Sequence, residues 1–379
     1  MTFMSILAMP FGYVIPFIVA LTIIVFIHEL GHFLVARWCG VKVEAFSIGF
    51  GREIFGWNDK QGTHWKVCWL PLGGYVKFEG DANAASLPQA TPDPSAIRSA
   101  GNFHGKPIWR RAAVVAAGPI ANFILAIAIF AFIFAFIGIP MNESRVEKVM
   151  PGSAAERAGI KDGDLITAVD GNKIATFGEL QQSVWNRGGE LLSVTIERNG
   201  NSVVLQVTPD TKEESDGFGG TIKIGLLGVQ RANDDAASSV HRLSIPDAIV
   251  KGSEETWHIV SVTMKYLGKV VTGRESSKQI GGAISIAKGA GDAASAGAMG
   301  FGNFIALLSV SVGLINLFPI PMLDGGHLVY YAIEAILGKP LGQEAQEWGF
   351  RVGLSLVAML MAFGFWNDLT RIFSMMVGS

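Results

Sequence analysis

Four long apolar stretches dominate the pattern of hydrophobic and polar positions along the chain. They cover about residues 13–36, 112–139, 301–318 and 352–366. A helix needs roughly 20 predominantly apolar residues to cross the hydrocarbon core of a bilayer. The first three stretches meet this need, and the fourth is short and needs help from its flanks. The pattern predicts an α-helical membrane protein with about four transmembrane helices.

The segment between the second and third apolar stretches follows a different pattern. Short β-prone runs surround the Asp-Gly and Asn-Gly pairs at residues 170–171 and 199–200, which are typical of tight hairpin turns. Thr176 and Glu179 form a capping box that predicts the start of a helix. We therefore expect a small soluble α+β domain at roughly residues 144–209.

A second capping box, Ser244 with Asp247, precedes an amphipathic pattern that predicts a helix over about residues 245–271. Residues 281–302 are then rich in Gly, Ala and Ser, which is typical of a linker, here close to the membrane surface.

These patterns divide the chain into four parts. Two spans and the loop between them occupy residues 1–139, and the inserted domain occupies residues 140–230. The amphipathic helix and the Gly-rich linker follow at residues 231–300, and the last two spans at residues 301–379.

The composition agrees with a membrane protein. Half of the 379 residues are hydrophobic, 16% are charged and the mean hydropathy is +0.38. The net charge of -2 says nothing about partners, and the sequence has no basic block long enough to suggest a nucleic-acid partner. The two cysteines, Cys39 and Cys68, form no CxxC pattern. The first apolar stretch lacks a preceding basic region and an A-x-A cleavage site, so we expect it to stay in the mature protein.

The lysines and arginines near the spans predict the orientation of the chain. The loop between the first two spans has five basic side chains close to its ends: Arg37, Lys42, Lys106, Arg110 and Arg111. Residues 1–12 have none, and the segment after residue 139 begins with two basic residues offset by two acidic ones. Because cytoplasmic loops carry the excess of positive charge, the first loop is predicted to be cytoplasmic. Both termini and the inserted domain would then face the periplasm of a bacterial inner membrane.

Candidate catalytic residues lie inside the first span, where residues 28–32 read HELGH. On a helix, residues four apart lie on one face, so His28 and His32 can bind a single zinc ion, and Glu29 can reach a metal-bound water. An ionisable side chain at the bilayer centre costs about 2.5–3.5 kcal/mol on insertion scales, which makes a functional role the default interpretation. The alternative is that these side chains lie at the membrane interface near Arg37 and only snorkel there.

A catalytic zinc site needs a third protein ligand and one open position for water. The third span ends in NLFPIPMLDGGH at residues 316–327, where two prolines and a glycine pair cannot continue a helix. Broken backbone at membrane depth is tolerated only where it is buried in protein or lines a wet cavity, and peptide hydrolysis needs such a cavity. Asp324 is the carboxylate within this break, with His327 as the rival ligand. A plain loop with Asp324 as a turn residue is the alternative.

These motifs together resemble the site-2 protease family over nearly the whole chain, and the closest branch is the bacterial regulator-of-sigma-E protease. The resemblance implies an intramembrane zinc metalloprotease. Its substrates would be single-span membrane proteins, such as anti-sigma factors, cut within the bilayer after a first protease has trimmed them. His28, His32 and Asp324 would bind Zn2+, and Glu29 would be the general base that activates a zinc-bound water. Asn316 would lie near the scissile carbonyl and stabilise the developing oxyanion.

Two further motifs are similar to those of this family. Residues 46–51 and 65–77 match its membrane re-entrant β-hairpin, whose exposed strand edge could hold a substrate in extended form. Gly118-Pro119 with Asn122 matches its GPxxN motif in the second span. Asn122 would bond a substrate or a loop backbone, and a packing role is equally consistent with its position.

The inserted domain also resembles a known module. Residues 149–171, VMPGSAAERAGIKDGDLITAVDG, are similar to the bacterial form of the PDZ domain, which implies a groove for an extended peptide or a C-terminus. A spacer domain with an empty groove is the alternative. The best-studied members of the branch carry two such domains and this chain has room for one, which puts the identity of the substrate in doubt.

Two other classes of function fit the sequence less well. A zinc transporter would place His and Asp in its spans, but it needs neither a general base nor a PDZ domain. A catalytically inactive scaffold would lack Glu29 or one of the ligands, and all of them are present.

Overall fold

The computed structural model describes residues 3–80, 101–141, 144–174, 176–215, 221–231, 239–273, 277 and 281–377. The chain divides into two compact units. The first comprises Met1–Phe132 and Ile245–Leu369, and the second comprises Ile133–Ser244 with Thr370–Ser379.

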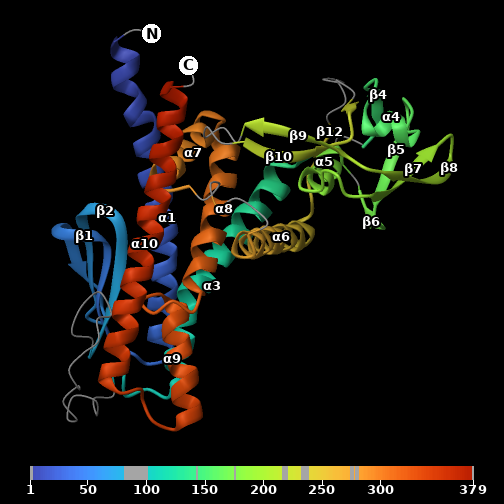
Figure 1. Ribbon diagram of the computed structural model, residues 1–379. Coiled ribbons are helices and arrows are strands. Elements are labelled where there is room, and N and C mark those ends of the chain that lie inside the picture. The colour runs from blue at the N-terminus through green and yellow to red at the C-terminus, as the bar shows by residue number, and fades with distance from the viewer. Residues whose placement is uncertain are drawn as a thin grey trace. The chain divides into compact units, whose positions relative to one another are not determined.

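Four helices among the described residues are long and apolar enough to cross a membrane, at Phe11–Trp38, Ile108–Ile137, Ala298–Asn316 and Glu344–Phe373. The helices that contain them are α1 (Phe3–Trp38), α3 (Ile108–Phe132), α8 (Ala298–Asn316) and α10 (Gln343–Val377). Consecutive spans run in opposite directions, as their labels and colours in Figure 1 show. The prediction of four apolar helices of spanning length is confirmed, and the fourth is twice as long as its apolar stretch because the helix continues through charged residues at its start.

Small residues allow the helices of the first unit to approach closely. A Cβ atom on Gly31 of α1 would overlap the carbonyl oxygen of Ala117 and lie 2.7 Å from Cβ of Ala121, both in α3. A Cβ on Gly313 of α8 would lie 3.1 Å from the carbonyl oxygen of Pro119. Such contacts hold membrane helices together, because the surrounding lipid leaves little hydrophobic driving force between them. Helix α3 therefore packs between α1 and α8.

The prediction of a flexible linker at residues 281–302 is wrong. This segment forms α7 (Ala283–Ser295) and the first turn of α8. Its N-terminus is held by Asp368 of α10, which accepts hydrogen bonds from the backbone N–H groups of Gly282 and Ile284, both at 3.0 Å. Its glycines allow close packing, since a Cβ on Gly291 would overlap the ring of Tyr13 in α1. The composition that is typical of a flexible linker serves here to seat a short helix against its neighbours.

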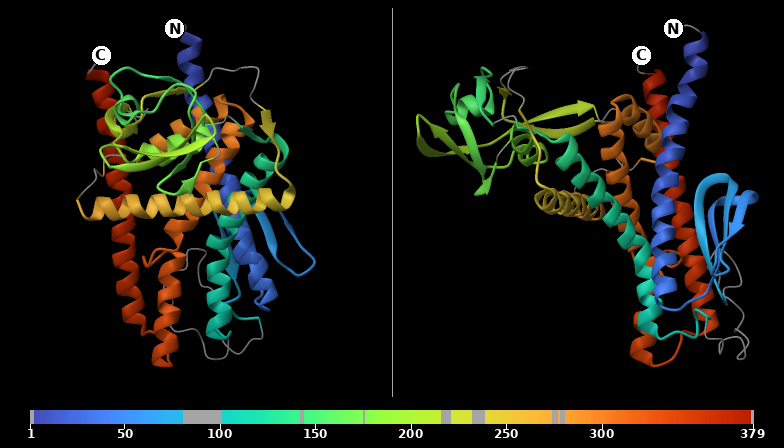
Figure 2. Two further views of the ribbon diagram at one scale, coloured as in Figure 1. Left: turned by 90° about the vertical axis from the view of Figure 1, so that its right-hand side faces the viewer. Right: turned by 180° about the vertical axis from the view of Figure 1, so that it is seen from behind.

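The predicted amphipathic helix is confirmed as α6 (Ile245–Val271). It crosses the direction of the spans at a steep angle, as the left view in Figure 2 shows. Ala248, Gly252 and Thr256 form its buried stripe. This stripe packs on α3, where a Cβ on Gly252 would lie 2.9 Å from the carbonyl oxygen of Ile127.

The first loop contains a long β-hairpin, made of β1 (Val43–Asn58) and β2 (His64–Phe78). Both strands bend at glycines with positive φ, Gly49 and Gly51 in β1 and Gly73 in β2, so residues 46–48 pair with residues 74–76 and also with residues 65–67. Phe46 is fully buried, with its ring 4.3 Å from that of Trp65 and 5.5 Å from that of Phe33 in α1. The hairpin runs alongside α1 (Figures 1 and 2).

The second unit contains the predicted β-rich domain, and the two hairpin turns are confirmed. Asp170 and Asn199 have φ angles of 48° and 51°, which Asp and Asn tolerate better than most residues. Thr176 caps α5 (Phe177–Trp185), because its side-chain oxygen accepts a hydrogen bond from the N–H of Glu179 at 3.2 Å.

A four-stranded antiparallel sheet in the order β6-β5-β7-β8 forms the centre of this unit. Its strands are β5 (Leu165–Val169), β6 (Asn172–Lys173), β7 (Leu192–Arg198) and β8 (Asn201–Val207), and α4 (Ala154–Ala158) lies beside it. Three strand pairs complete the unit: β4 (Val146–Val149) with β11 (Val229–Arg231), β9 (Asp210–Ser215) with β10 (Thr221–Leu226), and β3 (Ile139–Met141) with β12 (Ser239–His241). The π-helical turn η1 (Ile133–Ile137) precedes them.

The core of the domain extends past the turn-rich segment 144–209, into the longer range 140–230 that the division of the chain assigns to the domain. Leu227 is buried in the same core as Ile166 and Leu192, and Val229 packs against it. The strands after residue 209 therefore belong to the fold of this domain, which its turn signals alone did not indicate.

Candidate metal centre

The two histidines of the HELGH motif lie one turn apart on α1 and share a face. Each is 9% exposed, and their Nε2 atoms are 3.1 Å apart. Their rings meet edge to face with centroids 4.7 Å apart. The apolar sequence on either side keeps α1 helical through this motif, and the spacing of four then brings both imidazoles to one point.

The third side chain comes from the predicted break after the third span. Helix α8 ends at Asn316, and α9 (Asp324–Leu337) begins at Asp324. The turn between them is tight, with a φ of 92° at Met322. A Cβ on Gly326 would lie 2.7 Å from the carbonyl carbon of Ile320, so only glycine allows this return of the chain. The break therefore directs the Asp324 carboxylate back toward α1.

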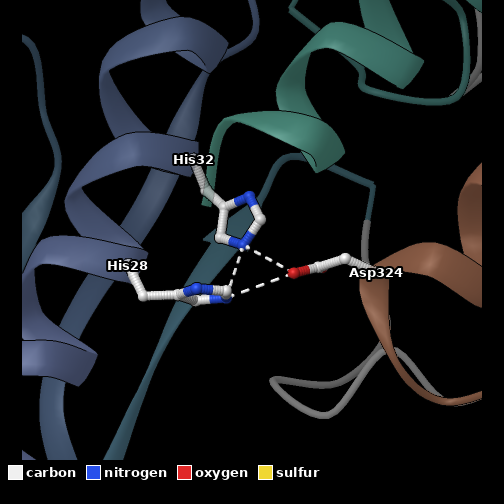
Figure 3. Close-up of side chains that lie close together, drawn as sticks. All are labelled: His28, His32 and Asp324. Carbon is white, nitrogen blue, oxygen red and sulfur yellow. Dashed lines mark hydrogen bonds and ion pairs between the residues drawn. The ribbon is translucent and has the colours of Figure 1, made fainter. Parts of the chain in front are cut away.

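Figure 3 shows the three side chains pointing toward one another from α1 and α9. Oδ2 of Asp324 lies 3.2 Å from Nε2 of His28 and 3.6 Å from Nε2 of His32. No other hydrogen-bond partner of this buried oxygen is found in the part of the chain that the structure describes. His327 lies outside the group, and its ring is edge-on to that of Tyr330 at 6.1 Å. Of the two rival ligands, the geometry favours Asp324.

These distances fit one tetrahedral ion. Nitrogen and oxygen ligands about 2.0–2.1 Å from a tetrahedral zinc are about 3.3–3.4 Å from one another. The three separations between the ligand atoms, 3.1, 3.2 and 3.6 Å, scatter around that value. Asp324 is also the first residue of α9, where the positive end of the helix dipole stabilises a carboxylate. The donor set is therefore suited to a divalent cation.

The distance of the two histidines from the end of the first span argues against the alternative that they lie at the membrane interface. His32 and His28 precede the end of the first span, Trp38, by six and ten residues. At 1.5 Å per residue, this places them about 9 and 15 Å along the helix from that end. Their side chains turn inward to Asp324 and do not extend toward the helix end.

Helix α3 packs against both histidines. The carbonyl oxygen of Val114 accepts a hydrogen bond from Nδ1 of His32 at 2.8 Å. Nδ2 of Asn122, which is fully buried, lies 3.2 Å from Nδ1 of His28. Between them, a Cβ on Gly118 would overlap Nε2 of His32 and lie 2.9 Å from Cε1 of His28. The position of Gly118 thus lets the backbone of α3 contact the two imidazoles.

A buried ion pair ties α9 to α3. The guanidinium of Arg111 donates two hydrogen bonds to the carboxylate of Glu334, at 2.6 and 3.1 Å, and both side chains are about nine-tenths buried. Arg111 also donates to the carbonyl oxygen of Lys106 at 3.1 Å. Because Asp324 begins the helix that Glu334 anchors, this pair helps to hold Asp324 in position.

Glu29 lies beside strand β2. Its side chain is half-buried, and a Cβ on Gly74 would lie 3.3 Å from its Cγ. The backbone of Val76 is a hydrogen-bond partner of its carboxylate. The strand that follows the bend at Gly73 therefore runs directly past the candidate base.

The remaining predicted residues have different outcomes. Asn316 is the half-buried last residue of α8, and among the described residues it has no hydrogen bond to the three clustered side chains. The side chain of Asn122 contacts a histidine, and no hydrogen bond from it to a loop backbone is found among the residues that the structure describes. The sequence interpretation missed the contact of Val114, which is made by the main chain and leaves no side-chain signal. Gly118 was named as part of the GPxxN motif, but its close approach to the histidines was not predicted; a glycine in a span where Ala would form a better helix is a signal for such an approach.

The known proteins that this chain resembles are named as metalloproteases. A model of peptidase family M50 matches residues 16–360. A candidate zinc metalloprotease of Agrobacterium fabrum is 45% identical over 365 residues, covering 95% of this chain and 96% of its own length. One of Rhizobium meliloti is 44% identical over 377 residues, covering 98% of this chain and 100% of its own. Metalloprotease MmpA of Caulobacter vibrioides is 41% identical over 376 residues, covering 93% and 94%.

Proposed function

The chain belongs to peptidase family M50 and is a zinc metalloprotease, and from this premise we propose that it cleaves peptide bonds within the membrane-spanning segments of other proteins. The main observation behind the proposal is the position of the cluster formed by His28, His32 and Asp324. Its two histidines lie well inside a 28-residue apolar span, and none of its three residues belongs to the β-rich domain. A substrate must therefore bring its scissile bond into the membrane-spanning part of the protein.

The proposed zinc ligands are His28, His32 and Asp324, which are the three side chains that fit a tetrahedral site. When bound, zinc supplies Lewis-acid polarisation of a water and of the scissile carbonyl. Three protein ligands leave one coordination position for this purpose.

Glu29 is the proposed general base. It accepts a proton from the water that adds to the carbonyl carbon, and it returns that proton to the amine nitrogen when the C–N bond breaks. Its neighbours fit this role, because the strand β2 shields one side of the carboxylate while the two histidines flank it on α1.

The hairpin is the proposed holder of an extended substrate. A transmembrane helix hides its peptide bonds in internal hydrogen bonds, so it must be extended locally before water can attack. Strand β2 next to Glu29 could pair with such a segment by strand addition. This role requires the hairpin to re-enter the membrane. Asn316 remains the proposed hydrogen-bond donor to the oxyanion.

Zinc content tests the metal site. The purified chain in detergent is expected to hold about one zinc per molecule, because a tetrahedral site with three protein ligands binds one ion. Replacing His28, His32 or Asp324 by Ala should remove the zinc, as measured by inductively coupled plasma mass spectrometry. His327→Ala is the matched control and should keep it. Full zinc occupancy in Asp324→Ala would show that the ligand is assigned wrongly.

The substrates we propose are single-span membrane proteins, of the anti-sigma-factor kind, that have already lost their outer domain. The β-rich domain would act as a PDZ-type filter that receives an extended peptide or a C-terminus. In sequence it lies between the second and third spans, and no residue of the metal cluster belongs to it.

Deleting residues 140–244, so that Ile139 is joined to Ile245, tests the filter. The deletion should leave cleavage of a trimmed substrate intact and increase cleavage of the same substrate with its outer domain. A filter acts on access, so only the bulky substrate should gain. Equal loss of both rates would show that the domain is a support or a recruiter, and the filter proposal would then fail.

The proposed location is a bacterial inner membrane, with the first loop cytoplasmic and the termini and β-rich domain periplasmic. Reporter fusions at Gly80 should then report the cytoplasm, and fusions at Asn199 should report the periplasm, because the first loop holds the excess of basic residues. Enzymes that are active on one side only, such as alkaline phosphatase, provide the measurement. The reverse pattern would overturn the orientation.

A further inference from the structure

The two histidines of the metal centre are contacted by α3 at their Nδ1 atoms, but the two contacts differ chemically. The partner of His32 is the carbonyl oxygen of Val114, which can only accept. Nδ1 of His32 therefore carries the proton, and its Nε2 atom presents a lone pair toward Asp324 and His28. This is the tautomer that a metal ligand needs.

His28 must adopt the same tautomer to bind through Nε2. Its Nε2 faces the cluster at 3.1 and 3.2 Å, so its proton belongs on Nδ1. The group opposite Nδ1 is the carboxamide of Asn122, with Nδ2 at 3.2 Å. Two N–H groups cannot bond to each other. Meanwhile, Oδ1 of Asn122 is buried and has no hydrogen-bond partner in the described parts of the chain.

A half-turn of the Asn122 carboxamide pairs these groups. It exchanges Oδ1 and Nδ2, which occupy nearly the same space, and brings the acceptor to the Nδ1–H of His28. The backbone of Asn122 is already held, since the hydroxyl of Ser309 in α8 donates to its carbonyl oxygen at 2.8 Å. The adjustment therefore needs only the terminal torsion of the side chain.

We infer that Asn122 is a positioning residue of the zinc site: its Oδ1 accepts the Nδ1–H of His28 and holds that imidazole in the tautomer and orientation that bind the metal. The inference rests on the proposed zinc site. It replaces the substrate contact expected from the sequence, because Asn122 is 0% exposed behind the histidine. Val114 and Asn122, eight residues apart on α3, thus anchor the two imidazoles.

Outer partners of this kind typically contribute about 10–100-fold to metal affinity, because they orient the ligand and make its free nitrogen more basic. Leu is similar to Asn in size and shape and lacks an acceptor. Asp supplies a stronger acceptor at the same place, as in the carboxylate–histidine–zinc arrangement. These two variants separate hydrogen bonding from packing.

The test is zinc affinity of the full-length chain in detergent, measured by competition with a chelator. Asn122→Leu should bind zinc about 10–100-fold more weakly than wild type. Asn122→Asp should bind at least as tightly as wild type. Ser309→Ala, which removes a neighbouring hydrogen bond to the backbone of Asn122 but no acceptor at His28, should stay close to wild type.

Three outcomes would overturn the inference. Asn122→Leu could bind zinc as tightly as wild type, which would leave Asn122 a packing role. Asn122→Asp could bind as weakly as Asn122→Leu, and this result is decisive even when the Leu variant does not fold. A wild-type chain that binds no zinc would overturn the proposed function as well, whereas the first two outcomes leave that function standing.

Discussion

Replacing Glu29 by Gln is expected to abolish cleavage while the zinc stays bound. Gln has the same shape as Glu, so the packing against Gly74 and β2 should persist. Its amide cannot take a proton from the attacking water, and loss of general acid–base catalysis typically costs about 100- to 10,000-fold in rate. The rate of cleavage of a purified single-span substrate, measured beside the zinc content of the same preparation, provides the test.

A matched substitution distinguishes the loss of the general base from a general effect of removing one negative charge. Glu254 is an exposed residue of α6, far from the metal cluster in sequence, and its carboxylate lies 3.7 Å from Nζ of Lys251. Glu254→Gln should therefore cleave at the wild-type rate. A Glu29→Gln chain that retains near-wild-type cleavage would show that another group accepts the proton.

Replacing Gly118 by Ala is expected to remove zinc binding without changing any ligand. The added Cβ would overlap Nε2 of His32 and lie 2.5 Å from its Cε1 atom. The ring cannot turn away freely, because the Val114 carbonyl holds its Nδ1. The atom that must move is the one that binds the metal, so zinc affinity should fall by about 100-fold or more, the upper end of the range for outer-partner losses.

Gly12→Ala is the matched control, since Gly12 is also a glycine in the first-span helix and an added Cβ would meet no atom within 4 Å beyond the helix's own backbone, among the described residues. This change should leave zinc affinity unchanged, because Ala is the better helix former by about 1 kcal/mol. Chelator competition on both variants measures the difference. Equal zinc affinity in Gly118→Ala and wild type would show that α3 does not touch the ligands as the structure has it.

Much of the site follows from local sequence. The spacing of His28 and His32 matches one turn of a helix, and an apolar stretch long enough to span a membrane holds them at depth. The two prolines and the glycine pair after the third span require a break, and Asp324 stands where α9 begins. All three ligand predictions needed only patterns within segments of a few dozen residues.

Other features depended on contacts between distant segments. Residues 281–302 have the composition of a linker, yet they form α7 because Asp368 of α10 caps its N-terminus and Tyr13 of α1 packs on Gly291. In the β-rich domain, Leu227 completes the core, a contact that lies within the predicted bounds of 140–230 but that those bounds do not specify. No periodicity within either segment indicates these partners.

The sequence alone therefore determines the four apolar helices, the hairpin turns and the chemical types of the three clustered side chains, because helix period, turn preference and hydrophobic length act within a segment. The contacts around those three side chains were determined by packing. Gly31 and Gly118 let α1 and α3 meet at backbone distance, which sets Val114 and Asn122 opposite the two imidazoles. Arg111 and Glu334 hold the helix that begins at Asp324. Such contacts join residues that are far apart along the chain, so they exist only once the helices have packed.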